Sequence, residues 1–212
     1  TAIDIDTRLR VGRSIGKNEE KVAAVMMKQI KTRFNLIEPP AIASDGNDSY
    51  PEAMLEIWGK SPEYAGRGRP PKHKQPKQEW KCLQVTKHRS GGRIRRITYR
   101  VVYGDPEEVI DFMSLNTAYV ERTNLTSRQM NGRMVRKTLS FSKEEKMLQA
   151  SCALEDAVYN LVRPVKTLRI EVNDDQRKWE NRSHAMAAGL TDHVWTIEEL
   201  MLTVVVPDEN NT

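Results

Sequence analysis

The stretch PAIASDGNDSYPEAMLEIWG, residues 40–59, decides the fold class of this 212-residue chain. It begins with a short apolar run that ends in Asp45 and a glycine, which is typical of a strand followed by a loop. The remainder predicts a helix with Pro51 in its first turn. Strand, acid, loop and helix in this order predict an α/β unit. Ligands of such folds bind beyond the carboxyl ends of strands, so Asp45 is a candidate functional residue; the alternative is a loop Asp that caps the helix.

The segments around this unit predict further elements of both kinds. Residues 2–15 predict a β-hairpin that turns near Asp4 to Thr7. Residues 19–34 predict a helix capped by Asn18 and stopped by Pro39-Pro40. A second hairpin is expected from strands over 80–87 and 93–103 around Ser90-Gly91-Gly92.

The second half of the chain predicts mainly helices. One helix is expected from a cap at Asn116 or Thr117 to about Lys137, with Glu121 as its solitary acid among polar residues. Another is expected from a capping box, Ser142 to Glu145, to Pro164. Its apolar stripe predicts a buried face, formed by Met147, Ala150, Leu154, Val158 and Leu161. The last 40 residues predict a polar stretch and short helices near 185–189 and 197–202.

Basic residues are concentrated in one region. Arg67 to Arg100 contains twelve Lys or Arg and one acid, Glu79, whereas the rest of the chain holds 22 basic and 28 acidic residues. Such a patch on an otherwise acidic protein is the electrostatic pattern of a polyanion binder.

The segment GRGRPPKHKQPKQ, residues 66–78, predicts an exposed arm, because it has three prolines and no large apolar residue. Its Arg67-Gly68-Arg69-Pro70 resembles an AT-hook, whose arginines enter the minor groove of A/T-rich DNA. The alternative is a solvated basic tether. The arm and the hairpin after it are expected to hold a phosphate backbone.

Asp45 and Glu121 are the two acids in settings that suggest chemistry. Paired carboxylates can hold two divalent ions that promote phosphoryl displacement, and Mg²⁺ prefers such oxygen ligands. With 29 acids in the chain, a chance pairing is the alternative. The cysteines, Cys82 and Cys152, lack metal-site spacing, and neither a signal peptide nor a membrane span is evident. We therefore expect a soluble, cytoplasmic protein.

The string NTAYVERTNLTSRQMNGRMVRKTLSFSKEE, followed by YNLVRP, KTLR and AMAAGLTDHVWTIEEL, resembles the catalytic domain of bacterial transposases of the insertion sequence one type. DIDTRLRVGRSIGK and SDGNDSYPEA resemble the earlier part of that domain, so the resemblance spans nearly all 212 residues in order.

The resemblance implies a ribonuclease-H-like α/β fold, with a mixed sheet flanked by helices and with residues 64–104 as a basic arm and hairpin inserted in one domain, 1–212. It implies a DDE transposase that cuts DNA and transfers strands with two Mg²⁺ or Mn²⁺ ions. Asp45 and Glu121 match the second and third acids. DNA contacts are expected from Arg67, Arg69, Arg122 and Arg128. The partners would be double-stranded DNA, in the bacterial or archaeal nucleoid, and at least one further copy of the chain; no membrane partner is expected.

Three features depart from the family pattern. The first catalytic Asp stands upstream of the segment matching AIDIDTRL, so we expect it, with its strand, to be missing from a chain that begins with Thr1; Asp4 or Asp6 is the alternative ligand. The family's RPHK is Arg163-Pro164-Val165-Lys166 here, and its PAMAAG begins with His184. The upstream end-recognition region of the family is also missing. The alternative functions are therefore a non-catalytic DNA-binding remnant or a ribonuclease-H-like nuclease.

Overall fold

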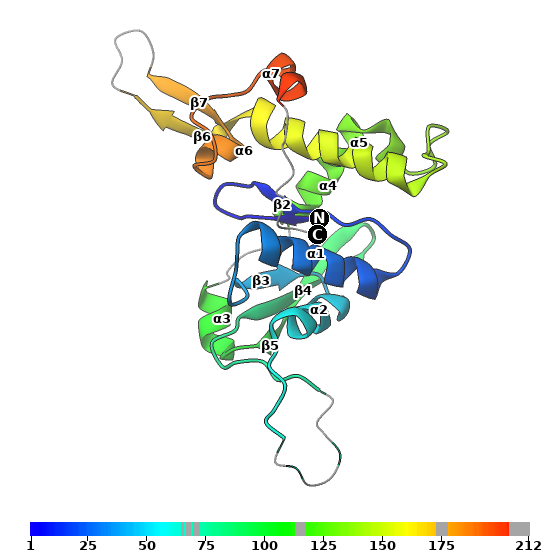
Figure 1. Cartoon of the computed structure of the whole chain (residues 1–212), viewed down its shortest axis with the longest axis vertical. Coiled ribbons are helices and arrows are strands. Elements are labelled where there is room, and N and C mark those ends of the chain that lie inside the picture. The colour runs from blue at the N-terminus through cyan, green and yellow to red at the C-terminus, as the bar shows by residue number, and fades with distance from the viewer. Residues whose placement is uncertain (65, 67–68, 70–72, 113–117, 173–177, 204–212) are drawn as a thin grey trace. The chain divides into compact units, whose positions relative to one another are not determined.

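The computed structural model describes residues 1–64, 66, 69, 73–112, 118–172 and 178–203 (Figure 1). The chain forms two compact units. Unit 1 consists of residues 1–2 and 12–122, and unit 2 of residues 3–11 and the chain from Thr123 on. No helix in the described ranges is long and apolar enough to cross a membrane.

The N-terminal hairpin is confirmed. Strands β1 (Ala2–Ile3) and β2 (Arg10–Gly12) form a two-stranded sheet. The carboxylate of Asp4 accepts hydrogen bonds from the N–H of Thr7 at 2.9 Å and from its hydroxyl at 2.5 Å. Asp4 therefore stabilises the turn of the hairpin, as a short polar side chain commonly does.

Unit 1 is built on a three-stranded mixed sheet. Strand β3 (Ile42–Ser44) is parallel to β4 (Cys82–Ser90), and β4 is antiparallel to β5 (Arg93–Tyr103). The predicted strand, acid, loop and helix are confirmed, because β3 is followed by Asp45 and by helix α2 (Ser49–Trp58). The predicted hairpin around Gly91-Gly92 is β4–β5.

Helices flank both faces of this sheet, as the alternation of β4 shows. Leu83 and Val85 form a buried cluster with Val109 of helix α3 (Pro106–Phe112). On the opposite face, the amide of Gln84 donates to the carbonyl oxygen of Asn47, just before α2. Because successive strand residues face opposite sides, α3 and α2 cover different faces. This is a mixed α/β arrangement, the general class that the sequence predicted.

Helix α1 (Glu19–Arg33) confirms the helix expected after Asn18, whose side chain accepts a hydrogen bond from the Lys21 N–H. It packs against α2. Met27 of α1 and Met54 of α2 are almost fully buried. Burying a side chain of this size stabilises the fold by about 1.5–3 kcal/mol.

Unit 2 contains helices and a second hairpin. Its elements are the part of α4 (Ala118–Met130) from Thr123 on, a 3₁₀ turn (Gly132–Met134), α5 (Glu145–Ala157) with its π-helical extension (Val158–Val162), β6 (Pro164–Glu171), β7 (Trp179–Ser183), α6 (His184–Ala187) and α7 (Ile197–Leu202). Strands β6 and β7 are antiparallel. The short helices were predicted, whereas the hairpin stands where a polar stretch was expected.

The prediction that the Glu121 helix runs to Lys137 was wrong, because α4 ends at Met130. Asn131 is extended and caps the following 3₁₀ turn, since its side-chain oxygen accepts from the Arg133 N–H at 3.1 Å. Its amide also donates to the Ser151 hydroxyl at 3.0 Å. The predicted cap residues, Asn116 and Thr117, lie outside the described residues.

The predicted capping box of α5 was also wrong. The helix begins at Glu145, and its N-cap Glu144 makes no side-chain capping hydrogen bond. The Ser142 hydroxyl instead accepts from the Arg133 guanidinium at 2.8 Å. The apolar stripe is not the buried face either, because Met147 and Leu154 are about half exposed. The residues buried along this helix and its extension are Cys152, Glu155 and Tyr159.

Candidate catalytic site

Asp45 lies at the carboxyl end of β3, beside the parallel strand β4. Its side chain is exposed, and its Oδ1 accepts a hydrogen bond from the Asn47 N–H at 3.3 Å, which closes a local turn. The other predicted role, a cap on α2, is not what the structure has, because the N-cap is Asp48 and makes no side-chain cap hydrogen bond. Asp45 thus presents a carboxylate at the sheet edge where α/β folds bind ligands.

The loop that carries Asp45 is fixed to the sheet by its neighbours. The buried amide of Gln84 on β4 donates to the Asn47 carbonyl oxygen at 3.1 Å and to Asp48 Oδ1 at 3.2 Å. The guanidinium of Arg100 on β5 donates to the same Asp48 oxygen at 3.0 Å. Two strands therefore hold the loop, and the buried Gln84 amide has the partners that burial requires.

The close approach of this loop to β4 depends on Gly46. A Cβ atom at Gly46 would lie 2.8 Å from the Thr86 hydroxyl oxygen, which is closer than real Cβ atoms come. Any other residue here would require the Thr86 side chain to move. The residue after Asp45 therefore lies directly against Thr86 of β4.

Glu121 lies next to the same strand, near the start of α4. Its Oε1 is 2.8 Å from the ammonium of Lys87 on β4, and the Lys87 side chain is 11% exposed while that of Glu121 is 51% exposed. Thr86 and Lys87 are consecutive, so the Asp45 loop and Glu121 both contact the outer part of β4, on opposite faces of the strand. Both belong to unit 1.

The donors present suit a hard divalent cation, since both are carboxylates exposed to solvent. Within the described residues, no group of three or more His, Cys, Asp or Glu could hold a metal ion. Asp4, the alternative third ligand, belongs to unit 2 and is engaged in the hairpin turn. Asp45 and Glu121 would therefore need a further ligand, which bound phosphate or a residue outside this set could supply.

Among the groups of unit 1 with shifted pKa values are Cys82 and Tyr50. Burial raises the pKa of the Cys82 thiol to about 12, so it stays protonated at neutral pH and is a poor nucleophile. Burial, followed by the negative charges of Asp45 and Glu19, raises the pKa of Tyr50. The Tyr50 phenol near Asp45 therefore remains a neutral hydroxyl that can donate a hydrogen bond.

The predicted DNA-contacting arginines are spread over several segments. Arg69 is exposed on the arm, and Arg67 lies outside the described residues. Arg122 is exposed next to Glu121 in unit 1, while Arg128 is exposed on the part of α4 that belongs to unit 2. Arg122 thus lies nearest in sequence to a candidate catalytic acid.

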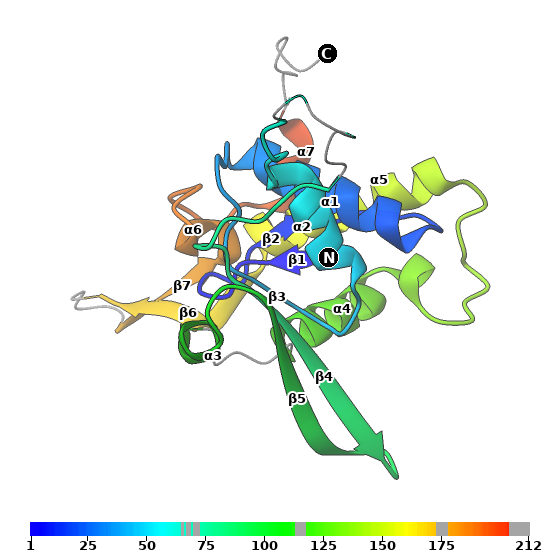
Figure 2. The ribbon, with the colours of Figure 1, turned by 90° about the horizontal axis from the view of Figure 1, so that it is seen from below.

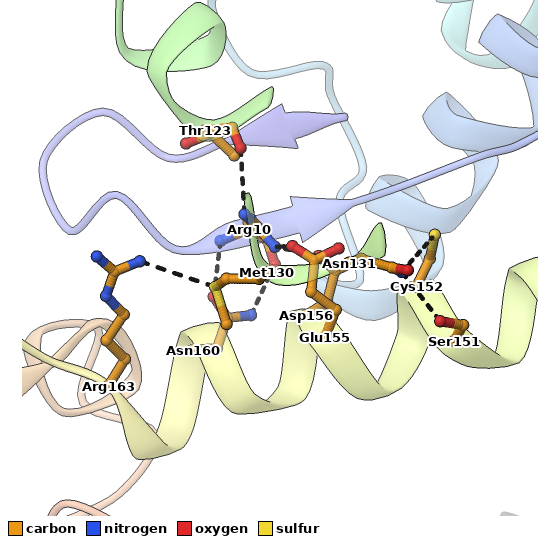
Figure 3. A network of polar contacts seen from close by, with 10 residues as sticks. All are labelled: Arg10, Thr123, Met130, Asn131, Ser151, Cys152, Glu155, Asp156, Asn160 and Arg163. Atoms are coloured by element: carbon orange, nitrogen blue, oxygen red, sulfur yellow. Dashed lines mark hydrogen bonds and ion pairs between the residues drawn. The ribbon is translucent and has the colours of Figure 1, made fainter. Parts of the chain in front are cut away.

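Sequence reasoning missed Lys87 as a partner of Glu121. The signal was weak, because Lys87 is one of many cations in this region and a contact across 34 residues leaves no periodic pattern. It also missed the buried network of unit 2, centred on Arg10 (Figure 3).

In that network, Arg10 Nη1 lies 2.5 Å from Glu155 Oε1 and 2.9 Å from Asp156 Oδ1. The other terminal nitrogen of the guanidinium, Nη2, donates to the Thr123 carbonyl oxygen at 3.3 Å. The guanidinium also lies 3.8 Å from the centre of the Tyr159 ring. Arg10 and Glu155 are buried, so each charge depends on the other. The cluster is a structural support of unit 2.

His184 extends this support. Its ring is stacked on Tyr159 with a centroid separation of 4.2 Å, and Nδ1 is 3.0 Å from the Thr7 carbonyl oxygen. Burial lowers the pKa of His184, an effect reinforced by nearby arginines although the hydrogen bond to Thr7 opposes it. The histidine that departs from the family pattern is therefore a neutral packing residue. Val165 lies in β6, paired with Arg182 of β7.

Comparisons of the chain with models of protein families, with curated proteins and with solved structures gave no match.

Proposed function

We propose that this chain is the catalytic domain of a DDE-type transposase of the insertion sequence one type, with a ribonuclease-H-like fold over residues 1–212 and an insertion at 64–104. The observation that carries the proposal is that both acids lie beside consecutive residues of β4, whose side chains leave opposite faces of the strand. The loop of Asp45 contacts Thr86, and Glu121 is paired with the next residue, Lys87. These are the two acids that the resemblance singles out.

Asp45 and Glu121 would hold Mg²⁺ or Mn²⁺, two ions in the family pattern, together with an upstream Asp. When bound, such ions activate the attacking oxygen and stabilise the leaving oxygen of a phosphoryl displacement. The fit rests on the donor chemistry, because both groups are accessible carboxylates.

The residues of this chain would act by holding the carboxylates and the DNA. The loop fixed by Gln84 and Arg100 keeps Asp45 at the sheet edge. Lys87 orients Glu121, and the exposed Arg122 beside it is placed to contact a phosphate.

The substrate would be double-stranded DNA at the element ends and at the target. A water oxygen attacks the phosphorus at the element end and the 3′ oxygen leaves as a hydroxyl. That 3′ hydroxyl then loses its proton and attacks the phosphorus of a target phosphodiester, whose own 3′ oxygen takes up a proton and leaves as a hydroxyl. Holding two DNA ends implies at least a dimer, and the DNA substrate implies a cytoplasmic, nucleoid-associated protein.

A non-catalytic DNA-binding remnant is the second candidate. The observation in its favour is that the described residues contain no group of three metal-binding side chains, while the basic hairpin is intact. A ribonuclease-H-like nuclease is the third, because cutting alone needs the same acids.

The test is a cleavage and joining assay on the full reading frame with Mg²⁺ or Mn²⁺, using DNA that carries the element ends. Asp45→Asn and Glu121→Gln are expected to lower joining by about 100-fold or more, the scale on which transition-state electrostatics act. Glu52→Gln is the matched control, because this acid is exposed on α2, the helix that follows the loop. It is expected to keep activity within about threefold, since a single exposed charge contributes little.

Each outcome separates the candidates. Unchanged joining in Asp45→Asn means that the catalytic assignment is wrong. DNA binding without any cleavage by the wild type supports the remnant. Cut but never joined products support the nuclease.

A further inference from the structure

The β4–β5 hairpin extends well beyond the sheet that anchors it (Figure 2). The side chains of Cys82 to Val85 are buried, whereas every residue from His88 to Ile97 is exposed. Strand β3 pairs with β4 only as far as Gln84. Ser90 lies five residues past Val85, so the ribbon reaches about 17 Å farther at roughly 3.3 Å per residue. We call residues 88–97 the hairpin tip.

The base and the tip of this ribbon also differ in how their basic residues are paired. At its base, Lys87 is paired with Glu121 and Arg100 with Asp48. The tip carries four arginines and no acid: Arg89, Arg93, Arg95 and Arg96. Among the described residues, none of these four forms an ion pair. The like charges repel one another in the free protein, so a polyanion would relieve the repulsion.

The register distributes these cations over both faces of the ribbon. His88 is opposite Arg96, Arg89 is opposite Ile94, and Ser90 is opposite Arg93, with a bulge between His88 and Arg89. Because residues opposite each other in the ladder face the same side, Arg93 and Arg96 share one face with His88, and Arg89 lies on the other face. Arg95 is the extra residue of the bulge. The exposed isoleucines, Ile94 and Ile97, share the face of Arg89. A ligand that engages all four arginines must therefore surround the ribbon rather than cover one side.

We propose that the hairpin tip binds double-stranded DNA by entering the major groove. This groove is about 12 Å wide and admits a two-stranded β-ribbon, with a phosphate backbone along each wall. Arg93 and Arg96 would meet one backbone and Arg89 the other. The exposed isoleucines would lie against the base edges, where apolar groups contact thymine methyl groups.

Other polyanions fit the tip less well. The deep, narrow major groove of A-form RNA cannot admit such a ribbon. Single strands are bound by stacking on aromatic side chains, and the tip, residues 88–97, contains none other than His88, which is hydrogen-bonded to Thr98 at 2.9 Å. Anionic lipid would meet a surface with cations on both faces, only one of which could lie on a membrane.

The inference shares its DNA partner with the proposed function but needs no cleavage. The test compares the full chain with a variant in which Arg89, Arg93, Arg95 and Arg96 are all changed to Gln. Binding to a duplex of about 30 base pairs is measured at several salt concentrations. For the tip variant, the slope of log affinity against log salt concentration is expected to become less steep by about 3 to 4, because each phosphate contact contributes about 0.9 to the slope. Its affinity at low salt is expected to fall at least tenfold.

The matched control changes four exposed cations near and along α1 to Gln, which alters net charge equally: Lys17, Lys21, Lys28 and Arg33. For this control, the slope of log affinity against log salt concentration is expected to change by less than about 1. Thermal unfolding of both variants verifies that they fold. An equal loss in the control would show that net charge alone binds DNA, and the inference would fail.

The groove is identified with two probes. Methylation of guanine N7, which lies in the major groove, is expected to weaken wild-type binding and to have little effect on the tip variant. Netropsin fills the minor groove of the duplex. It is expected to leave unchanged the difference in DNA affinity between the wild type and the tip variant. The inference fails if netropsin abolishes that difference, or if the tip variant loses equal affinity for a single strand, an RNA duplex or anionic vesicles.

The two proposals fail separately. The chain could bind DNA with a salt dependence that falls in the tip variant and yet never cut or join DNA. That result contradicts the proposed activity and leaves the hairpin assignment intact. Alternatively, the chain could join DNA while the salt dependence of its binding is the same with and without the tip arginines. That result contradicts the hairpin assignment alone.

Discussion

The ammonium of Lys87 lies 2.8 Å from Oε1 of Glu121, and this ion pair joins strand β4 to the start of helix α4 within unit 1. A divalent cation at Glu121 must share the carboxylate with this ammonium or replace it. The Lys87 side chain is much less exposed than that of Glu121, so the lysine remains close to the carboxylate.

Lys87→Gln is therefore expected to strengthen Mn²⁺ binding by a few fold. An ion pair with one exposed partner contributes about 0.2–1 kcal/mol, and 1 kcal/mol corresponds to about fivefold in affinity. Titration of the DNA-free protein, with free Mn²⁺ followed by electron paramagnetic resonance, measures this. Lys87→Arg should behave like the wild type and Glu121→Gln should bind most weakly; weaker binding by Lys87→Gln would mean that the lysine does not compete.

Removing Arg10 is expected to destabilise unit 2 strongly. Arg10→Met leaves Glu155 as a buried charge without its partner, which costs about 3–5 kcal/mol. The double variant Arg10→Met/Glu155→Met should recover much of this loss, because it removes both charges. Urea unfolding of the single and double variants gives the two values. A double variant no more stable than the single would show that the ion pair is not the cause.

His184 makes stability depend on pH in a defined direction. Its pKa is lowered in the folded chain from the usual 6.5, so the unfolded chain binds more protons as pH falls below that value. Stability is then fully present above pH 6.5 and decreases towards pH 5. His184→Phe keeps an aromatic ring against Tyr159 and should remove this part of the decrease.

The measurement is the melting temperature from pH 7.5 to 5. His193 acts in the opposite sense, because the hydrogen bonds that its ring donates to Asp192 and Glu199 raise its pKa. They add stability that is present at low pH and lost as pH rises. His193→Asn in both backgrounds removes this contribution. An identical pH profile with and without His184 would contradict the assignment.

Two glycines with positive φ allow crowding to be separated from backbone strain. Gly104 has φ +98°, and a Cβ there would lie 2.5 Å from the Trp80 carbonyl oxygen and 2.7 Å from Val109 Cγ2. Gly91 has φ +57° with no atom within 4 Å of such a Cβ. Gly104→Ala should cost about 2 kcal/mol or more, and Gly91→Ala about 1 kcal/mol, in chemical unfolding. Equal costs would mean that Val109 and Trp80 can move aside.

Local patterns predicted the elements whose signals are local. Asn18 caps α1 and Asp45 follows β3 because a cap and a strand end are decided by a few neighbouring residues. The turn at Asp4 is of the same kind. These elements were correct in type and close in extent.

The wrong predictions concern side chains whose hydrogen-bond or ion-pair partners are distant in the sequence. Ser142 does not cap α5, because the guanidinium of Arg133 uses its hydroxyl. The face of α5 that contains Glu155 is buried because Arg10 neutralises it, and no local pattern predicts a buried acid. At the candidate site, Asp45 and Glu121 were singled out by their local settings and then by the resemblance, whereas the contact between Lys87 and Glu121 required the fold.

The division of the chain also has a consequence for the order of folding during synthesis. Residues 12–122 form nearly all of unit 1 and are contiguous, so they can fold as soon as they leave the ribosome. Arg10 must wait for Glu155, 145 positions later. Residues 3–11 are therefore synthesised before unit 1 and reach their native contacts after it, and the long sequence separation of this pairing slows the folding of unit 2.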